Sequence, residues 1–297
     1  MTYQTELAAN IQANVSAALL EDLRLLSRRR HGEKPAEFLS LDLTAKLIPR
    51  DKVGHASIIT RQDAVLCGQP WVDACFKMLD PDCSINWHAQ DGDEIKANQL
   101  LCEIRGNARA MLSAERAALN FLQTLSATAT AAHKYAALIA GSKAKIMDTR
   151  KTLPGLRVAQ KYAVKTGGGH NQRIALFDGI LIKENHIMAA GGIGAVLAEA
   201  QRIAPAGMSI QIEVETLDEL REALAAGAIL ILLDNFDLAA MREAVRLTAG
   251  RAELEASGGV NMDSVRAIAE TGVDRISIGA LTKDIQALDL SMRFHMS

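Results

Sequence analysis

The sequence lacks the features of a secreted or membrane-spanning protein. No apolar run approaches the roughly 18 residues that a membrane-spanning helix needs, and residues 1–23 have neither a basic start nor a continuous apolar stretch. Only four cysteines occur in 297 residues, and they form no CxxC pair. A chain of this length does not need disulfides to support its core. We therefore expect a cytoplasmic protein with reduced, structural thiols and no cysteine-based metal site.

The sequence also lacks an excess of positive charge. Its 33 Lys and Arg and 35 Asp and Glu residues give a formal net charge of −2, whereas nucleic-acid-binding proteins are usually strongly basic. The one dense basic run, Arg28, Arg29 and Arg30, is interpreted as a solvated loop rather than an anion site. A hydrophobic content of 49% is ordinary for a soluble chain with one large or two moderate domains.

From about residue 146, short apolar runs alternate with helical patterns. The runs predict strands at KIMDTR, GILIKEN, SIQIEVET, AILILLDN, AELEASGG and RISIGA. The three stretches TLDELREALAAG, DLAAMREAVRLTAG and NMDSVRAIAETG each begin with an N-cap residue and end at Gly, as helices do. Asp234 follows Glu213 by 21 residues, Ser257 follows after 23 more and Gly279 after another 22. This regular βαβ repeat favours an α/β barrel, short or irregular because only six strands are clear.

The part before residue 130 has a different pattern. Residues 10–26 predict an amphipathic helix, and antiparallel strands are expected on both sides of a turn at Asp91-Gly92. An Ala-rich helix or helix pair is expected over residues 113–140. The first domain is therefore α+β and the second α/β.

Polar side chains recur where the predicted strands end. In SIQIEVET, alternation places Ile210, Ile212 and Val214 towards the outer helices and the polar residues towards the barrel interior. The inward-facing set over all strands is Asp148, Arg150, Lys183, Asn185, Gln211, Glu213, Glu215, Asp234, Glu253, Glu255, Ser257, Ser277 and Gly279. Burial of an unpaired charge costs several kcal/mol, so such a set predicts an active site at the carboxyl ends of the strands rather than isolated core ion pairs.

The last two strands predict a phosphate site. Gly258, Gly259 and Gly279 would let backbone N–H groups approach an anion, and a helix beginning near Asn261 would direct its dipole there. Ordinary glycine turns are the alternative interpretation. Barrels commonly bind phosphate after these strands.

Cations surround the same predicted pocket: Arg150, Lys151, Lys183 and, after the loop TGGGHNQR, Arg173. They indicate a ligand with both carboxylate and phosphate groups. Glu213 and Asp234 would repel such a ligand unless they bind hydroxyl groups or Mg²⁺. A sugar diphosphate carried with magnesium satisfies each of these conditions.

Several motifs resemble the quinolinate phosphoribosyltransferase family. They are DTRKTLPGLR, KYAVKTGGGHNQR, LIKENHI, EVET, LLDNF, EASGGV and SIGALT, with AERAALNFLQTLS upstream, in order from about Glu21 to the end. The resemblance implies an N-terminal open α/β sandwich over 1–128, joined by a C-terminal helix at 286–297, and an incomplete α/β barrel over 129–285. It also implies transfer of a phosphoribosyl group to quinolinate with loss of CO₂, with Mg²⁺ present, in a homodimer.

The resemblance assigns roles to individual residues. Lys151, Lys183, Glu213 and Asp234 are the implied catalytic residues, the two acids also facing the metal through substrate and water. Arg116 is expected to reach across from the neighbouring subunit. The implied substrate-binding residues are Arg116, Thr149, Arg150, Lys151, Arg173, Lys183, Glu213, Asp234, Ser257, Gly258, Gly259, Ile278, Gly279 and Ala280.

The sequence departs from the family pattern in two places. Gln172 stands where the family often has histidine, with His170 two positions earlier, and the early turn EDLG is EDLR here. Two alternatives remain open: a relative that transfers the same phosphoribosyl group to another base, as in the molybdenum-linked members, and a binding protein without catalysis. The paired cations favour quinolinate, and retention of both acids disfavours a mere sensor.

Overall fold

The computed structural model describes residues 3–23 and 34–295, which form two units. The first unit comprises Met1–Ala131, Leu153–Gly167 and Ile285–Ser297, and the second comprises Ala132–Thr152 and Gly168–Asp284. Assignment of residues 153–167 to the first unit was not predicted from the sequence. The basic run Arg28–Arg30 lies outside the described residues.

An antiparallel sheet organises the first unit. Its order is β12-β1-β5-β3, formed by β1 (Val53–Thr60), β3 (Ser84–Trp87), β5 (Leu100–Asn107) and β12 (Leu290–His295). A separate pair joins β2 (Ala64–Val65) to β4 (Glu94–Ile95). The end of the chain was expected to return to this domain as a helix, which is wrong. It returns as strand β12, because its backbone pairs with β1 from His55 opposite His295 to Thr60 opposite Leu290.

Helices complete the core of the first unit. They are α1 (Tyr3–Leu23), α2 (Gln69–Leu79), most of α3 (Ala108–Leu138) and α4 (Arg157–Thr166), with short 3-10 helices η2 (Pro35–Leu41) and η3 (Ala45–Leu47). The expected helices at 10–26 and 113–140 correspond to α1 and α3, and α3 is one continuous helix. Trp71 and Phe76 of α2 pack in one apolar cluster with Ile58 of β1 and Leu122 of α3. This cluster holds the sheet and helices together.

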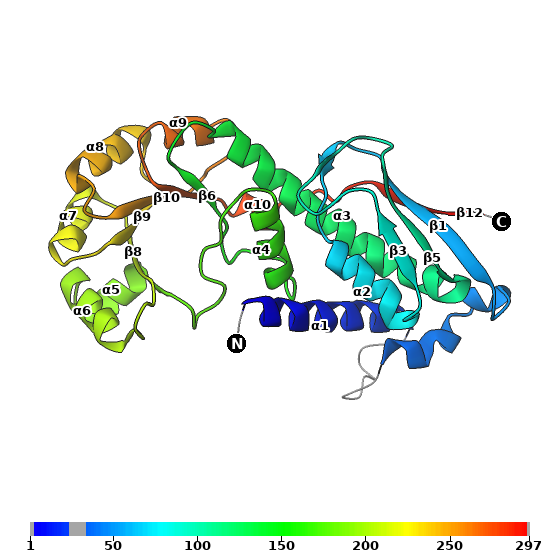
Figure 1. Ribbon diagram of the computed structural model, residues 1–297. Coiled ribbons are helices and arrows are strands. Elements are labelled where there is room, and N and C mark those ends of the chain that lie inside the picture. Colours follow the sequence, from blue (N-terminus) through cyan, green and yellow to red (C-terminus); the bar gives the residue numbers. More distant parts are fainter. Residues whose placement is uncertain (1–2, 24–33, 296–297) are drawn as a thin grey trace. The chain divides into compact units, whose positions relative to one another are not determined.

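The second unit contains the six predicted strands as one parallel sheet. They are β6 (Lys145–Met147), β7 (Ile180–Ile182), β8 (Ile210–Val214), β9 (Leu230–Asp234), β10 (Glu253–Ser257) and β11 (Arg275–Ser277). The order is β6-β11-β10-β9-β8-β7, so β6 and β7 are edges and the barrel is not closed. Figure 1 shows the strands along the inside of an arc, with helices on its outer side.

Two helices of this unit begin at capping side chains that the sequence supplies. The helices of the unit are α5 (Glu184–Ala190), α6 (Ile193–Ile203), α7 (Leu217–Ala225), α8 (Leu238–Thr248), α9 (Val265–Ala269) and α10 (Ala280–Lys283). The Thr216 hydroxyl accepts the N–H of Glu219 at 3.2 Å, and the Asp237 carboxylate accepts that of Ala240 at 2.7 Å. These side chains satisfy N–H groups that the first helical turn leaves unpaired.

Alternation along the strands separates an apolar layer from a polar interior. Ile212 and Val214 of β8 are fully buried, as are Leu220 of α7 and Met241 of α8 on the helical side. Gln211, on the opposite face of β8, is buried in the interior. The predicted division of β8 between helices and interior is therefore confirmed at these positions.

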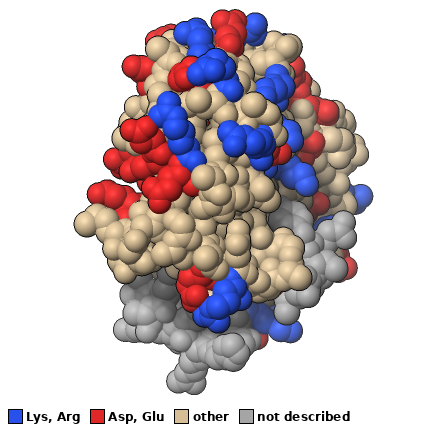
Figure 2. Space-filling model, turned by 90° about the vertical axis from the view of Figure 1, so that its left-hand side faces the viewer, with Lys and Arg blue, Asp and Glu red and all other residues tan. Residues whose placement is uncertain are grey.

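Charges of both signs are mixed on the outer helices. In Figure 2, which shows the side of α6, α7 and α8, blue and red groups lie next to one another. Several form pairs one turn apart, namely Arg202 with Glu199, Arg221 with Asp218 and Arg246 with Glu243. Such exposed pairs contribute little to stability, and this face is a solvated helical surface.

Candidate active site

A cavity of about 340 Å³ opens where the strands of the second unit end. Its lining residues come from all six strands or the segments that follow them: Asp148, Thr149, Arg150, Lys151, Gln172, Arg173, Leu181, Lys183, Glu213, Leu232, Glu255, Ser257 and Ser277. Parallel strands bring their carboxyl ends to the same side of a sheet, so residues far apart in the chain meet here. Seven of the predicted site residues are among them: Thr149, Arg150, Lys151, Arg173, Lys183, Glu213 and Ser257.

A lysine and a glutamate form an ion pair in this cavity. Lys183 follows β7 and places its Nζ 2.8 Å from Oε2 of Glu213 on β8. The lysine side chain is 49% exposed and the glutamate 13%. Because the pair is half open to solvent, it contributes little to fold stability. Its effect is to hold the two charged groups in a fixed arrangement.

Asp234 lies beside this pair at the end of β9. Burial and the neighbouring Glu213 raise the pKa of Asp234 above its ordinary value, whereas Lys183 and Lys151 act in the opposite direction. Asp234 is not among the lining residues of the cavity in the described chain, but these charge interactions place it close to them. Two acids and two lysines therefore share one electrostatic environment.

Two arginines approach each other on the cationic side of the cavity. Burial and the nearby Arg150 lower the pKa of the Arg173 guanidinium. Arg173 donates from Nη1 to the carbonyl oxygen of Gly179 at 2.9 Å. Like charges held together in this way favour a bound anion, and guanidinium groups suit carboxylates in particular.

Lys151 is fixed by the segment that follows β11. A β-carbon on Gly279 would lie 2.9 Å from Cδ of Lys151, so the lysine chain passes directly over the glycine. The Thr282 hydroxyl donates to the carbonyl oxygen of Lys151 at 2.7 Å. The absence of a side chain at position 279 thus leaves room for this cation.

The floor of the cavity is a buried polar network. Gln172 Nε2 lies 2.6 Å from each carboxylate oxygen of Glu255 and 3.1 Å from Oε1 of Gln211. Burial raises the pKa of Glu255, while hydrogen bonds from Gln172, Gln211 and Ser277 lower it. Asp148, also buried, accepts from Gln172 N–H at 2.8 Å and Asn171 Nδ2 at 2.6 Å.

Sequence reasoning placed Asp148, Glu255 and Ser277 inside the barrel but did not include them in the site. Gln172 was noted only as a departure from the family pattern. Its position directly before Arg173 in a glycine-rich loop was the available signal, but its partners on other strands were not readable from the sequence.

The predicted phosphate-binding residues follow β10 and β11. Of these, Ser257 lines the cavity, whereas Gly258, Gly259, Ile278, Gly279 and Ala280 are not among its lining residues in the described chain. The expected helix near Asn261 is wrong in its start and length: α9 begins at Val265 and has five residues. Asn261 instead accepts the N–H groups of Asp263 and Ser264 at 3.0 Å, which forms a turn before the helix.

Six residues predicted to face the interior are not among the lining residues of this cavity, namely Asn185, Gln211, Glu215, Asp234, Glu253 and Gly279. Three of them lie away from it. Strand β7 ends at Ile182, so Asn185 lies exposed in α5. Glu215 follows the end of β8 and lines a separate surface cavity with Glu184 and Glu219. Glu253 is at the opposite, amino-terminal end of β10, where it is exposed and pairs with Arg275. Alternation predicts a face correctly but does not show where a short strand begins and ends.

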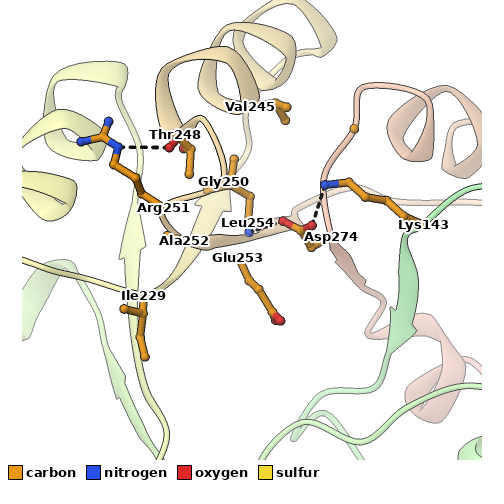
Figure 3. Close-up of a pocket in the computed structure, with 11 residues that line it drawn as sticks. Lys143, Ile229, Val245, Thr248, Gly250, Arg251, Ala252, Glu253, Leu254 and Asp274 are labelled. Atoms are coloured by element: carbon orange, nitrogen blue, oxygen red, sulfur yellow. Dashed lines mark hydrogen bonds and ion pairs between the residues drawn. The ribbon is translucent and has the colours of Figure 1, made fainter.

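A second cavity, of about 300 Å³, lies at the amino-terminal end of the strands (Figure 3). Three of its charged groups, Lys143, Arg251 and Asp274, bind one another or the backbone. Lys143 Nζ lies 2.6 Å from Oδ1 of Asp274, and Arg251 Nε donates to the Thr248 carbonyl oxygen at 3.1 Å. This end of a barrel usually serves stability rather than chemistry.

Glu213 and Asp234 are the candidate metal-facing residues. Among residues 3–23 and 34–295, no group of three or more His, Cys, Asp or Glu side chains is arranged to hold a metal ion. Two carboxylates suit the oxygen preference of Mg²⁺, which commonly keeps several waters and binds substrate phosphates. The donor set therefore fits an ion held mainly by substrate and water.

Arg116 lies in α3, in the first unit. Its expected role across a subunit interface stays a prediction. No helix in the described part of the chain is both long and apolar enough to span a bilayer.

Comparisons with known proteins agree along nearly the whole chain. Residues 128–293 match the quinolinate phosphoribosyl transferase C-terminal domain, and residues 42–126 match its N-terminal domain. The probable nicotinate-nucleotide pyrophosphorylase [carboxylating] of Bacillus subtilis is 40% identical over 256 residues, which cover 86% of this chain and 89% of that protein. The chloroplastic nicotinate-nucleotide pyrophosphorylase [carboxylating] of Arabidopsis thaliana is 39% identical, over 83% of this chain and 75% of that protein.

Solved structures give the same result. The nicotinate-nucleotide pyrophosphorylase from Francisella tularensis superposes with a TM-score of 0.88 at 42% identity, covering 97% of each chain. That from Ehrlichia chaffeensis has a TM-score of 0.84 at 34% identity, covering 95% of this chain and 97% of the other.

Proposed function

The chain belongs to the quinolinate phosphoribosyltransferase family, and we propose that the cavity at the carboxyl ends of its barrel strands is the catalytic site. The reaction transfers the phosphoribosyl group of 5-phosphoribosyl 1-diphosphate to quinolinate. It yields nicotinate mononucleotide, diphosphate and CO₂ and belongs to NAD biosynthesis. The observation that carries the proposal is the meeting of Arg150, Lys151, Arg173 and the Lys183–Glu213 pair in one cavity.

Quinolinate has two adjacent carboxylates on a pyridine ring, and the arginine pair is suited to them. Arg150 is close enough to Arg173 to lower the pKa of its guanidinium, and both line the cavity. Each guanidinium can donate two parallel hydrogen bonds to one carboxylate. A dianion bound between them relieves their mutual repulsion, so the free site is arranged in advance for this substrate.

The ribose part of the donor needs negative charge nearby. As diphosphate leaves, the ribose carbon becomes oxocarbenium-like, and fixed carboxylates stabilise that positive charge most where they already stand in place. Glu213 and Asp234 supply them and can accept hydrogen bonds from ribose hydroxyls. Lys183 holds Glu213 at 2.8 Å, so the acid does not have to reorganise during the reaction.

The leaving diphosphate is stabilised by positive charge. Lys151 and Lys183 supply part of this charge from the chain, and Mg²⁺ bound with the donor would neutralise the phosphate oxygens. Glu213 and Asp234 would face that ion with water and substrate as its further ligands. Absence of added Mg²⁺ should therefore weaken donor binding.

The remaining predicted residues are assigned to the 5-phosphate and its surroundings: Thr149, Ser257, Gly258, Gly259, Ile278, Gly279 and Ala280. Backbone N–H groups after β10 and β11 suit phosphate oxygens. The position of Ser257 in the cavity wall supports this assignment.

The chemical steps require little covalent participation by the protein. The pyridine nitrogen of quinolinate attacks the ribose carbon as the bond to diphosphate breaks. The carboxylate beside the ring nitrogen then departs as CO₂, the pyridinium stabilises the electron pair left on that carbon, and a proton from solvent adds there. The chain's contribution is binding, orientation and electrostatic stabilisation.

We further propose a homodimer in which Arg116 of one subunit completes the site of the other. This rests on the family resemblance around AERAALN. An arginine from a second subunit would add positive charge at the mouth of the cavity, where the dicarboxylate or the diphosphate lies.

A cytoplasmic location is proposed on the state of the cysteines. Cys67, Cys75, Cys83 and Cys102 are all unpaired and buried, as in proteins of a reducing compartment. Fractionation of cells that express the chain tests this.

A direct assay tests the proposed function. Purified protein is incubated with quinolinate, 5-phosphoribosyl 1-diphosphate and Mg²⁺, and nicotinate mononucleotide and CO₂ are measured. Nicotinate, which has one carboxylate fewer, is the matched control base and should react far more slowly, because one guanidinium then has no partner. Equal rates with both bases, or binding without CO₂ release, would contradict the assignment.

A further inference from the structure

Gln172 contacts more of the cavity framework than its place in a loop suggests. We propose that Gln172 is a positioning residue, whose clamp on the buried Glu255 holds Arg173 in place to bind the dicarboxylate. This inference rests on the proposed function and assigns part of its substrate selectivity to a residue outside the predicted site.

The clamp is formed by two side-chain amides around one carboxylate. Gln172 Nε2 is 2.6 Å from both oxygens of Glu255, and Gln211 Nε2 is 3.0 Å from Oε2. Glu255 is 0% exposed. A buried carboxylate that loses hydrogen bonds is strongly destabilised, so these amides are fixed in position as firmly as the acid itself.

The backbone of Gln172 is anchored as well. Its N–H donates to Oδ1 of the buried Asp148 at 2.8 Å, and Asn171 donates to the other oxygen at 2.6 Å. Asp148 follows β6, whereas Glu255 is on β10 and Gln211 on β8. One residue thus joins segments from three strands.

This anchoring occurs at the open side of the barrel. Strands β6 and β7 are the two edges of the sheet. The loop between His170 and Arg173 bridges to β6 through the pairing of His170 with Met147. Beyond this backbone bridge, the contacts of Gln172 with Asp148 and Glu255 tie the loop to further strands.

Arg173 is the next residue and needs such support. Its guanidinium is close to that of Arg150, and the two repel each other when no anion is bound. The bond from Arg173 to the Gly179 carbonyl lies on the loop itself. The clamp one residue away ties this arginine to the rigid strands.

Gln172 also forms part of the wall between two cavities. Gln172, Arg173 and Leu181 line both the 340 Å³ cavity and a neighbouring cavity of about 260 Å³. A fixed amide here therefore sets the depth of the substrate cavity, and a shorter side chain would join the two spaces.

A charge-exchange series tests the clamp. Gln172→Glu places a second carboxylate against Glu255 and should raise KM for quinolinate by about tenfold or more. KM for the phosphoribosyl donor should change less than about twofold, because the donor is assigned to residues other than Arg150 and Arg173. Gln201→Glu, the same substitution at an exposed position of α6, is the matched control and should remain near wild type.

The double variant Gln172→Glu/Glu255→Gln reverses the pair. It should recover KM for quinolinate to within about threefold of wild type, because one carboxylate again meets amide donors. A Gln172→Glu variant with unchanged KM for quinolinate, an equal rise in both KM values, or no recovery in the folded double variant would overturn the proposal.

Two further measurements keep the test independent of folding and of turnover. If Gln172→Glu does not fold, Gln172→Asn, one methylene shorter, should still raise KM for quinolinate, and an unchanged KM overturns the clamp. The affinity of each variant for quinolinate, measured by calorimetry without the phosphoribosyl donor, tests the clamp independently of turnover. Wild-type product formation, measured separately, judges the proposed reaction.

Discussion

The side-chain oxygen of Asn235 occupies the space that a β-carbon on residue 258 would need: Oδ1 lies 2.1 Å from that position above Gly258. Asn235 follows β9 with a left-handed backbone (φ 56°). Its N–H donates to the Ser257 carbonyl oxygen at 2.9 Å, and Nδ2 donates to Oδ2 of Asp234 at 3.0 Å. Asn235 therefore supports two parts of the proposed site. It holds Asp234, the acid proposed to face the ribose, and it contacts the loop at Gly258 that is proposed to hold the phosphate.

Replacement of Gly258 should disturb both the position of Asp234 and the loop proposed to hold the phosphate. Gly258 has φ +101°, which L-residues rarely adopt, and Gly258→Ala would also clash with Asn235. We expect KM for the phosphoribosyl donor to rise about tenfold or more, with KM for quinolinate affected less. Gly194→Ala is the control, because an added β-carbon there meets no atom within 4 Å and should leave both constants unchanged. Steady-state kinetics in which the two variants behave alike would remove the Gly258 loop from the donor site.

Loss of Arg150 should lower turnover. Arg150→Ala removes one of two adjacent guanidiniums in the cavity, and we expect a decrease in kcat/KM of roughly 10²-fold or more. Arg150→Lys keeps the charge but not the bidentate geometry and should recover only part of the loss. Arg105→Ala, at an exposed position on β5, is the control. Near-normal activity of Arg150→Ala would exclude this residue from the site.

Asp234 should weaken the fold at neutral pH. Burial and Glu213 raise the pKa of Asp234 above 3.8, so its charged form is less stable in the folded chain than in the unfolded one. This destabilisation is present at pH 7 and is relieved as the pH falls through the raised pKa. Asp234→Asn should therefore unfold at a higher urea concentration than wild type at pH 7, with the difference vanishing below pH 3.8, and should lose activity.

Asp63 is the control for that experiment, because its pKa is shifted in the opposite direction from that of Asp234. Hydrogen bonds from the Ala97 N–H and Lys96 lower the pKa of Asp63 below 3.8. Asp63→Asn should therefore gain no stability at pH 7 and should retain activity. A wild-type midpoint at pH 7 equal to or above that of Asp234→Asn would contradict the expected repulsion.

Mixing inactive variants tests the proposed dimer. Arg116→Ala and Lys151→Ala are each expected to be nearly inactive. After they are unfolded together and refolded, half of the dimers should contain one chain of each kind and one intact site, so activity should recover to roughly a quarter of wild type. A mixture of Lys151→Ala and Lys183→Ala is the control and should not recover, because both changes lie in the same subunit's cavity. Recovery in neither mixture would place Arg116 in its own subunit's site or in none.

Much of the second unit could be predicted from its sequence. Six apolar runs became β6 to β11, and Thr216 and Asp237 cap helices where their positions indicate. The errors fall at element ends: Asn185 lies past β7, and α9 starts four residues after Asn261. The C-terminal segment was expected to be a helix from the family resemblance. It is a strand whose partner, β1, is more than 200 residues away, so no local pattern indicated the pairing.

The sequence by itself determined which runs form strands and which of their residues share a face, since alternation and capping depend on neighbours a few positions apart. Only the tertiary structure decided the strand order, the open edge between β6 and β7, and the contacts of Gln172 with Glu255 and Asp148. Those depend on pairings between segments tens of residues apart, whose free energy comes from burial and backbone hydrogen bonds that no local pattern encodes.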